Sequence, residues 1–309
     1  MSEFNRRHSA EQVSDGVDLS GRHALVTGAN TGIGRETARV LALRGASVTM
    51  ACRDLEKAKR ARDEIVAQSG GAIPAERLDL GELDLASLAS VRSFGARFLE
   101  SGRPLHLLVN NAGVMLPSRR QTADGFEAHF GINHLGHFLL THQLLGLLEA
   151  SAPARVICVA SDALAAASLD DQFADLNWES RRFSGFRSYG DSKLMNVMFA
   201  AELTRRMKGA GVVANALHPG IVKTELGRDQ PWYFSLVAVF MLPILKSPER
   251  GASTTVYAAT SPKYSDRGGL YFADNAEKNI PKLARDPQAC ARLWEISEEL
   301  AGVRATEGS

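Results

Sequence analysis

Short apolar runs alternate with helix-forming segments along most of the chain, and this alternation constrains the fold more than any other feature. The run at 23–28 ends in glycine, and the segment after it, 32–46, carries apolar residues at helical spacing. The same order recurs, with further apolar runs at 47–52, near the Leu-Asp-Leu triplets of 78–85, and at 105–110, 155–161 and 212–220. Such alternation predicts a parallel sheet covered by helices on both faces. We therefore predict an α/β fold, a Rossmann-type doubly wound sheet in a single domain.

No linker divides the alternating region, which runs from about residue 19 to residue 301. We expect residues 1–18 to form a flexible polar tail and residues 302–309 a second tail. A long helix is predicted over about 124–149, and it could pack on a second copy of the chain in a homo-oligomer. Because residues 1–18 lack the apolar core of a signal peptide, we expect a cytoplasmic location.

The charge and cysteine content exclude several classes of function. Lys and Arg number 36 against 35 Asp and Glu, and a net charge of +1 gives no reason to expect a nucleic-acid partner. Three scattered cysteines favour buried apolar side chains over a disulfide framework or a zinc cluster. We expect no metal site, since His134 and His137 have neither metal-like spacing nor acidic partners.

The longest nearly uninterrupted apolar run lies at 231–245. It is shorter than the roughly 20 residues that a membrane-spanning helix needs, so we predict no transmembrane segment. We expect 231–250 to form a lid over an apolar substrate. Protein core, a dimer face and a peripheral membrane contact through 231–245 remain alternatives.

The first apolar run leads into the glycine-rich sequence TGANTGIG at 27–34. In an open parallel sheet, ligands bind beyond the carboxyl ends of the strands, where this loop lies. Its glycines let the backbone approach a ligand, and the amides of the following helix face a negative charge. The loop thus predicts a pyrophosphate cradle, and a purely structural turn is the alternative. The predicted contacts are Gly28, Asn30, Thr31, Gly32, Ile33 and Gly34.

Three motifs together resemble the short-chain dehydrogenase/reductase family: the glycine loop, NNAG at 110–113 and YxxxK at 189–193. Further segments resemble its retinol-dehydrogenase-like branch, namely ACRD (51–54), 122–142, SKLMNV (192–197), HPGIVKTEL (218–226) and GGLYF (268–272). The resemblance covers nearly the whole chain. It implies an oxidoreductase that acts on bulky apolar carbonyls and alcohols.

The residue after the second strand should select the cofactor, because it meets the adenosine ribose. Here that residue is Arg53, and a guanidinium suits the 2′-phosphate of NADP(H) by charge and by fork geometry. Arg35, which lies just past the glycine loop, could assist in binding the phosphate. We predict NADP(H) over NAD(H). If Arg53 is only a solvated residue and Asp54 a helix cap, either cofactor would bind.

The resemblance implies further cofactor contacts. It places Asp84 and Leu85 at the adenine, with Asp79 as the alternative aspartate. The turn of Asn111, Ala112 and Gly113 would lie beside the adenosine ribose. Ile221 and Thr224 would lie near the nicotinamide.

Tyr189 and Lys193 are one helical turn apart and share a helix face. A free tyrosine has a pKa near 10, and a neighbouring ammonium lowers it, which would make Tyr189 a useful general acid or base. The resemblance implies a catalytic quartet and a lysine that also binds the nicotinamide ribose. Its members here are Asn133, Ser161, Tyr189 and Lys193.

Each remaining member of the quartet has an expected role. Ser161 ends the run at 155–161 and would hold the substrate oxygen, although it could instead cap a helix. The amide of Asn133 interrupts an apolar helical stripe and needs hydrogen-bond partners if buried. The resemblance implies that the backbone carbonyl of Asn133 holds a water that leads to Lys193. Trp178 and Phe183 are expected in an insertion between Ser161 and Tyr189.

The sequence thus predicts an NADP(H)-dependent oxidoreductase that interconverts a small or bulky apolar carbonyl and its alcohol. Two alternatives remain. One is a reductase of conjugated double bonds, as in the protochlorophyllide reductases, which share a similar YxDSK helix. The other is a non-catalytic NADP(H)-binding regulator.

Overall fold

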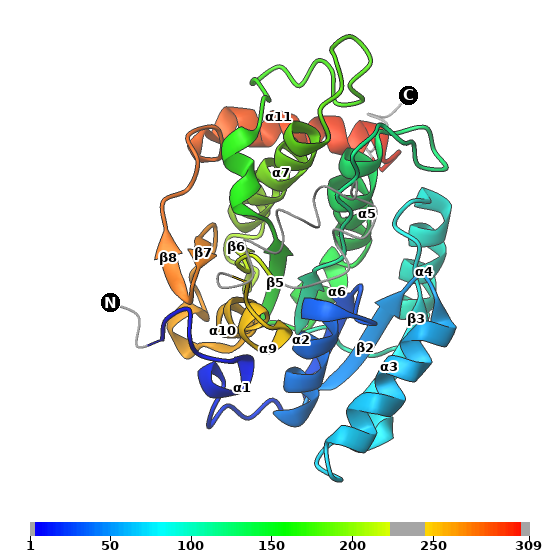
Figure 1. Cartoon of the computed structure of the whole chain (residues 1–309), viewed down its shortest axis with the longest axis vertical. Coiled ribbons are helices and arrows are strands. Elements are labelled where there is room, and N and C mark those ends of the chain that lie inside the picture. Colours follow the sequence, from blue (N-terminus) through cyan, green and yellow to red (C-terminus); the bar gives the residue numbers. More distant parts are fainter. Residues whose placement is uncertain (1–3, 223–244, 304–309) are drawn as a thin grey trace.

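The computed structural model describes residues 4–222 and 245–303, and in these ranges the chain forms an eight-stranded sheet with the order β3-β2-β1-β4-β5-β6-β7-β8 (Figure 1). Strands β1 to β7 run parallel, and β8 is antiparallel to β7. The strands are β1 His23–Thr27, β2 Ser47–Cys52, β3 Leu78–Glu82, β4 Leu107–Asn110, β5 Ala154–Val159, β6 Val212–His218, β7 Tyr271–Ala273 and β8 Ala276–Lys278. The prediction of a single doubly wound α/β domain is confirmed.

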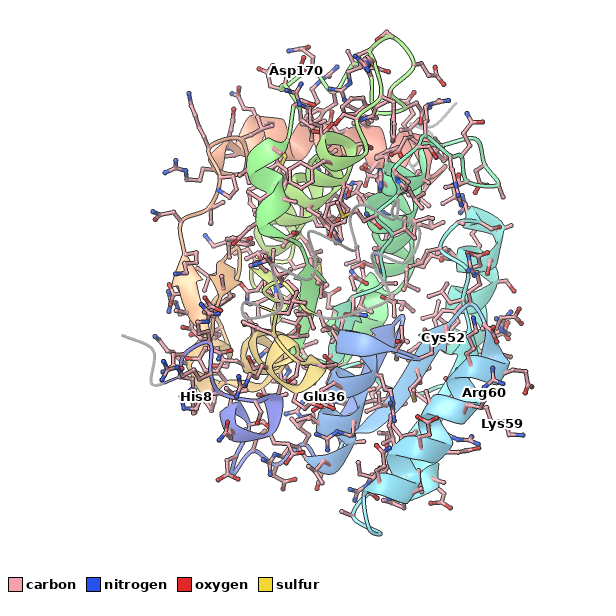
Figure 2. All side chains as sticks on the ribbon, in the orientation of Figure 1. His8, Glu36, Cys52, Lys59, Arg60 and Asp170 are labelled. Carbon is pink, nitrogen blue, oxygen red and sulfur yellow. The ribbon has the colours of Figure 1, made fainter. Side chains whose placement is uncertain are left out.

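Helices cover both faces of the sheet (Figure 1). They are α1 Ala10–Val13, α2 Gly32–Leu43, α3 Leu55–Gln68, α4 Leu88–Glu100, α5 Gly136–Gln143, α6 Leu145–Ala150, α7 Gly185–Arg206, α9 Pro248–Gly251, α10 Ser253–Thr260 and α11 Pro287–Leu300. The side chain of Asp54 caps α3 by accepting from the Lys57 amide at 3.0 Å. Helix α3 buries Ala58 and exposes the charged Lys59 and Arg60 (Figure 2), as expected for a surface helix.

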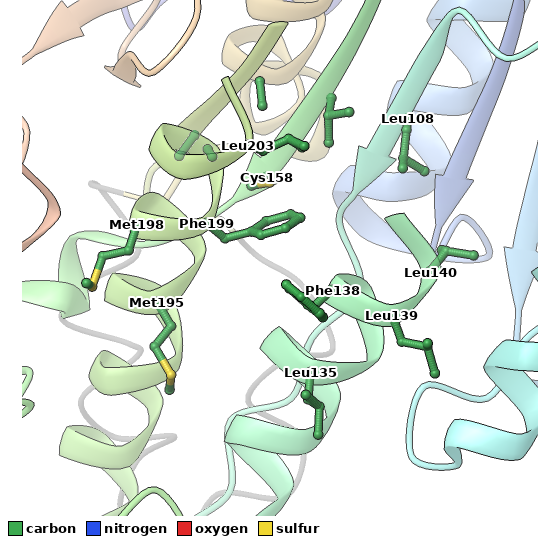
Figure 3. Close-up of a cluster of buried hydrophobic side chains, with 14 of the residues drawn as sticks. Leu108, Leu135, Phe138, Leu139, Leu140, Cys158, Met195, Met198, Phe199 and Leu203 are labelled. Atoms are coloured by element: carbon green, nitrogen blue, oxygen red, sulfur yellow. The ribbon is translucent and has the colours of Figure 1, made fainter. Parts of the chain in front are cut away.

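The sheet separates two apolar cores. On β5, Ile157 belongs to the core beneath α2, α3 and α10, whereas Cys158 belongs to the core beneath α4, α5, α7 and α11. This follows from the period of two along a strand. In the second core, Phe138 of α5 and Phe199 of α7 meet edge to face, with ring centroids 5.6 Å apart (Figure 3). This contact packs the part of α7 that follows Tyr189 and Lys193 against α5.

The N-terminal segment differs from the predicted tail. Ser9 and Gln12 form a reciprocal capping box at α1, and Ala10 and Val13 are buried against α2 and α10. The prediction of a flexible tail over 1–18 is wrong for these residues, because two apolar side chains in one turn suffice to dock a short helix.

The predicted long helix over 124–149 is also different. Gly125 has φ +86°, and Gln121 pairs with Glu127 in an antiparallel bridge, so the chain cannot be helical at 124. A π-helix spans His129–Leu135 and continues into α5 and α6. The sequence periodicity does not distinguish a π-helix from an α-helix.

The hairpin of β7 and β8 was not predicted, because each strand has only three residues. Asp274 and Asn275 join them with φ of 52° and 62°, the left-handed pair that a tight hairpin requires. No helix within 4–222 or 245–303 is long and apolar enough to cross a bilayer. Of the predicted lid segment 231–250, residues 231–244 lie outside the described residues, and α9 begins at Pro248.

Candidate active site

The predicted site residues meet at the carboxyl edge of the sheet. Gly28 follows β1, Asn111 follows β4, Ser161 lies two residues beyond β5, and Pro219 follows β6. Because these strands are parallel neighbours, their ends lie side by side although the residues are far apart in sequence. The convergence expected from the motifs is present.

The glycine loop leaves no room for a side chain at Gly34. A Cβ on Gly34 would lie 2.4 Å from the Gly28 oxygen and 2.4 Å from Asn111 Nδ2. Thr31 precedes α2 but its side chain makes no capping hydrogen bond within the described chain, so first-turn amides remain available to an anion. This backbone cradle fits the pyrophosphate of a dinucleotide.

Thr27 joins the glycine loop to the NNAG turn. Its Oγ1 accepts hydrogen bonds from the amides of Asn111 at 2.9 Å and Ala112 at 3.0 Å, and Asn111 Nδ2 donates to the Thr27 carbonyl at 2.7 Å. A Cβ on Gly28 would lie 3.0 Å from Ala112. Although Thr27 lies inside the quoted motif, it was not predicted as a site residue, because only the three-dimensional contacts assign its hydroxyl.

Arg53 stands at the end of β2 with its side chain exposed. In the described part of the chain it makes no ion pair or hydrogen bond, whereas Arg35 is bound to Glu64 at 3.0 Å. Asp54 caps α3, as the alternative interpretation expected. Capping by Asp54 and a free guanidinium at Arg53 are therefore compatible.

The two candidate aspartates, Asp79 and Asp84, lie at different places relative to β3. Asp79 lies within β3, opposite Thr49, and pairs with Arg103. Asp84 and the buried Leu85 follow the carboxyl end of β3. Their position at the ligand edge agrees with the choice of Asp84 and Leu85.

Tyr189 and Lys193 are both buried on α7, at 5% and 3% exposure. The Ser161 side chain lies beside the Tyr189 hydroxyl, and Lys193 Nζ lies 5.5 Å from the centroid of the Tyr189 ring. Ser161 Oγ also accepts from the Ala163 amide at 3.2 Å, so its capping role and its contact with Tyr189 coexist. The phenol, the amine and the serine form one cluster.

The pKa of Tyr189 in this cluster differs from the expectation. Burial raises the pKa of Tyr189 to about 12, although the neighbouring Ser161 side chain acts to lower it. Burial lowers the pKa of Lys193 to about 8. The predicted lowering of the tyrosine pKa is wrong here, because loss of hydration disfavours both charged forms more than neighbouring groups stabilise them.

Asn133 lies fully buried in the π-helix, and its amide has the partners that the sequence required. Oδ1 accepts from the Val114 amide at 2.8 Å, and Nδ2 donates to the Val114 carbonyl at 3.1 Å and to Ser192 Oγ at 3.0 Å. A Cβ on Gly113 would lie 3.1 Å from Asn133 Oδ1. Asn133 thus ties the NNAG turn to α7.

Lys246 supports the turn after β6. Its Nζ donates to the Pro219 carbonyl at 3.2 Å and pairs with Asp274 at 2.8 Å, and its backbone amide donates to the Ile221 carbonyl at 2.8 Å. Ile221 is 46% exposed at this edge. Thr224, the other predicted contact, lies outside the described residues.

The insertion before α7 places aromatic side chains beside the cluster. Trp178 and Phe183 meet edge to face, Phe183 stacks on His129, and the His129 ring meets Tyr189 at 6.0 Å. Arg181 lies 3.6 Å above the Trp178 ring. His129 was not predicted as a site residue, since nothing in its local pattern separates it from other histidines.

Comparison with known proteins agrees with this geometry. The family model described as short chain dehydrogenase matches residues 22–169. Human retinol dehydrogenase 13 is 43% identical over 293 residues, covering 93% of this chain and 86% of that protein. Mouse retinol dehydrogenase 12 is 43% identical over 288 residues, covering 93% and 89%.

Solved structures agree as well. A structure of an uncharacterized protein from Mycobacterium paratuberculosis is 35% identical, with a TM-score of 0.74 and coverage of 94% of this chain and 97% of that one. The Pseudomonas aeruginosa RhlG/NADP active-site complex is 26% identical, with a TM-score of 0.65 and coverage of 82% and 95%. The chain belongs to the short-chain dehydrogenase/reductase family, in its retinol-dehydrogenase-like branch.

Proposed function

We propose that the protein is an NADP(H)-dependent oxidoreductase that interconverts a bulky apolar carbonyl compound and its alcohol. The observation that carries this proposal is the cluster in which the Ser161 side chain lies beside the Tyr189 hydroxyl, with Lys193 on the same helix face. Two hydroxyl groups at one point can hold a substrate oxygen and exchange a proton with it.

The cofactor would be held by groups that the sequence and the fold bring together. The backbone of Gly28, Gly32 and Gly34 would take the pyrophosphate, and the free guanidinium of Arg53 would take a 2′-phosphate. The NADP of the Pseudomonas complex supports the same choice here. When bound, the nicotinamide supplies or accepts the hydride.

In the reductive direction, the side chains handle the proton and the charge. A pKa of about 12 keeps the Tyr189 phenol protonated at neutral pH, so it can donate to a carbonyl oxygen. Ser161 would hold that oxygen by a hydrogen bond as negative charge develops. Below its pKa of about 8, Lys193 is an ammonium that stabilises the phenolate left behind.

The class of substrate is inferred from the aromatic side chains that pack beside Tyr189. Aromatic rings of Trp178, Phe183 and His129 lead from the insertion to Tyr189, which favours an apolar substrate of some size. The names of the retinol dehydrogenases point the same way. A lid at 231–250, a homo-oligomer and a cytoplasmic location stay predictions.

The test is oxidation of NADPH and of NADH with a panel of apolar aldehydes and ketones. We expect turnover with NADPH, loss of at least about 100-fold in Tyr189→Phe, and a selective loss of NADPH affinity in Arg53→Ala. Tyr264→Phe is the matched control, because Tyr264 is buried against Tyr257 and Phe272, outside the crevice. Equal rates for wild type and Tyr189→Phe would refute the mechanism. A product reduced at C=C would show that the reaction is reduction of a conjugated double bond and not of a carbonyl group.

A further inference from the structure

His137 is a buried histidine whose two ring nitrogens contact two different parts of the predicted site. The residue lies on α5 and is 2% exposed. Its Nδ1 is 3.0 Å from the backbone oxygen of Asn133, and its Nε2 is 2.8 Å from Thr27 Oγ1. The ring therefore spans the distance between the predicted catalytic asparagine and the end of β1.

One arrangement of protons satisfies both contacts of His137, with the Thr27 hydroxyl directed to Nε2 at 2.8 Å in preference to the Val109 carbonyl at 3.4 Å. A carbonyl oxygen can only accept, so His137 Nδ1 carries the proton. Burial lowers the pKa of His137 to about 3, so the ring is neutral at pH 7 and Nε2 accepts from the Thr27 hydroxyl. The oxygen of Thr27 then accepts the amides of Asn111 and Ala112.

We propose that His137 is a positioning residue that couples Asn133 to the turn of Asn111 and Ala112. The inference rests on the proposed function, because that turn is the one expected to hold the adenosine ribose. A shift of Asn133 or of the turn would break a buried hydrogen bond of His137 or Thr27. The side of the site that handles the proton and the side that binds the dinucleotide are thereby held at a fixed separation.

A simpler account is that His137 is only a core histidine with satisfied nitrogens. His134 provides the comparison, because it lies three residues earlier, is 1% exposed and has its Nε2 3.0 Å from Ser297 Oγ. Ser297 belongs to α11, which does not carry any predicted site residue. His134 thus has the same burial and a hydroxyl partner at Nε2, whereas its Nδ1 makes no hydrogen bond within the described residues and the ring has no link to the cofactor turn.

The experiment compares His137→Asn with His134→Asn in the full chain. Asparagine keeps an amide near the position of Nδ1 but does not reach Thr27. We expect His137→Asn to raise the amide exchange of residues 110–114 and to weaken NADPH binding about tenfold, the effect of one buried hydrogen bond. His134→Asn should leave both within about twofold of wild type.

Thr27 supplies a second, nearly isosteric test if His137→Asn folds poorly. Thr27→Val should raise exchange at 110–114, Thr27→Ser should restore wild-type behaviour, and adding His137→Asn to Thr27→Val should have little further effect. Equal exchange in the His137 and His134 variants, or additive effects at Thr27 and His137, would overturn the coupling. Absence of NADPH binding in wild type would refute the proposed function alone, since amide exchange tests His137 without the cofactor.

Discussion

Lys193 Nζ donates a hydrogen bond to the carbonyl oxygen of Val159 at 2.9 Å. Val159 is the last residue of β5 and lies two positions before Ser161. The same lysine that lies beneath the Tyr189 ring thus fixes α7 to the strand that delivers the serine. The contact explains how a helix and a strand end keep the hydroxyl groups of Tyr189 and Ser161 beside each other.

Replacing Lys193 with methionine should impair activity and change stability through two opposing effects. The Val159 carbonyl would lose its main donor, at a cost of about 1–3 kcal/mol in the free energy of unfolding, whereas removal of a buried ammonium offsets this cost below pH 8. Loss of the ammonium should lower kcat about 100-fold or more. Urea unfolding and steady-state rates measure these effects, and a variant with normal kcat would contradict the role of the charge.

The pH dependence should reflect the shifted pKa of Lys193. The folded value of about 8 lies below the ordinary value of 10.5, so between these pH values the unfolded state binds more protons than the folded state. Stability contributed by this group therefore rises as pH increases from about 8 to about 10.5. The rate of carbonyl reduction should instead fall as pH rises through about 8, because the ammonium is lost.

The matched measurement is the difference between wild type and Lys193→Met. The stability difference between them should change across that pH window and stay constant between pH 6 and about 7. A difference that is flat up to pH 10 would show that Lys193 has an ordinary pKa.

Gly34→Ala should damage the cofactor cradle. The new methyl group would approach the Gly28 oxygen and Asn111 Nδ2 to 2.4 Å, and the backbone oxygen cannot move without opening the turn. We expect a loss of about 1–3 kcal/mol in unfolding free energy and a marked loss of NADPH affinity. Gly146→Ala is the control, since a Cβ there meets nothing within 4 Å and should be neutral or stabilising.

Asp191→Ala should release the insertion that precedes α7. The buried carboxylate of Asp191 pairs with Arg181 at 3.0 Å and accepts from the Ser168 amide at 2.6 Å. We expect faster tryptic cleavage after Arg181 and a higher KM for bulky substrates, with NADPH affinity unchanged. The exposed Asp171 in the same loop gives the control, and equal cleavage of Asp191→Ala and Asp171→Ala would contradict this anchoring role.

The sequence predicted features that local patterns determine. The glycine loop, the NNAG turn and the Tyr189–Lys193 spacing are each defined by a few neighbouring residues, so the sequence was enough to place the first two at strand ends and the last on one helix face. The role of His137 was not predictable, because its partners Thr27 and Asn133 come from different elements and are identified only by contact. The direction of the Tyr189 pKa was missed for a related reason: burial depends on the whole fold, whereas the distance to Lys193 depends on one helix turn.

The two apolar cores on either side of the sheet have a consequence for how such an enzyme can diversify. The glycine loop and α2 are supported by one core, and α7 with Tyr189 by the other. Substitutions that reshape the packing around α7, α11 and the insertion can alter which compounds are accepted while the core that supports the glycine loop and α2 keeps its dimensions. New specificities can thus arise on one face of the sheet without rebuilding the other.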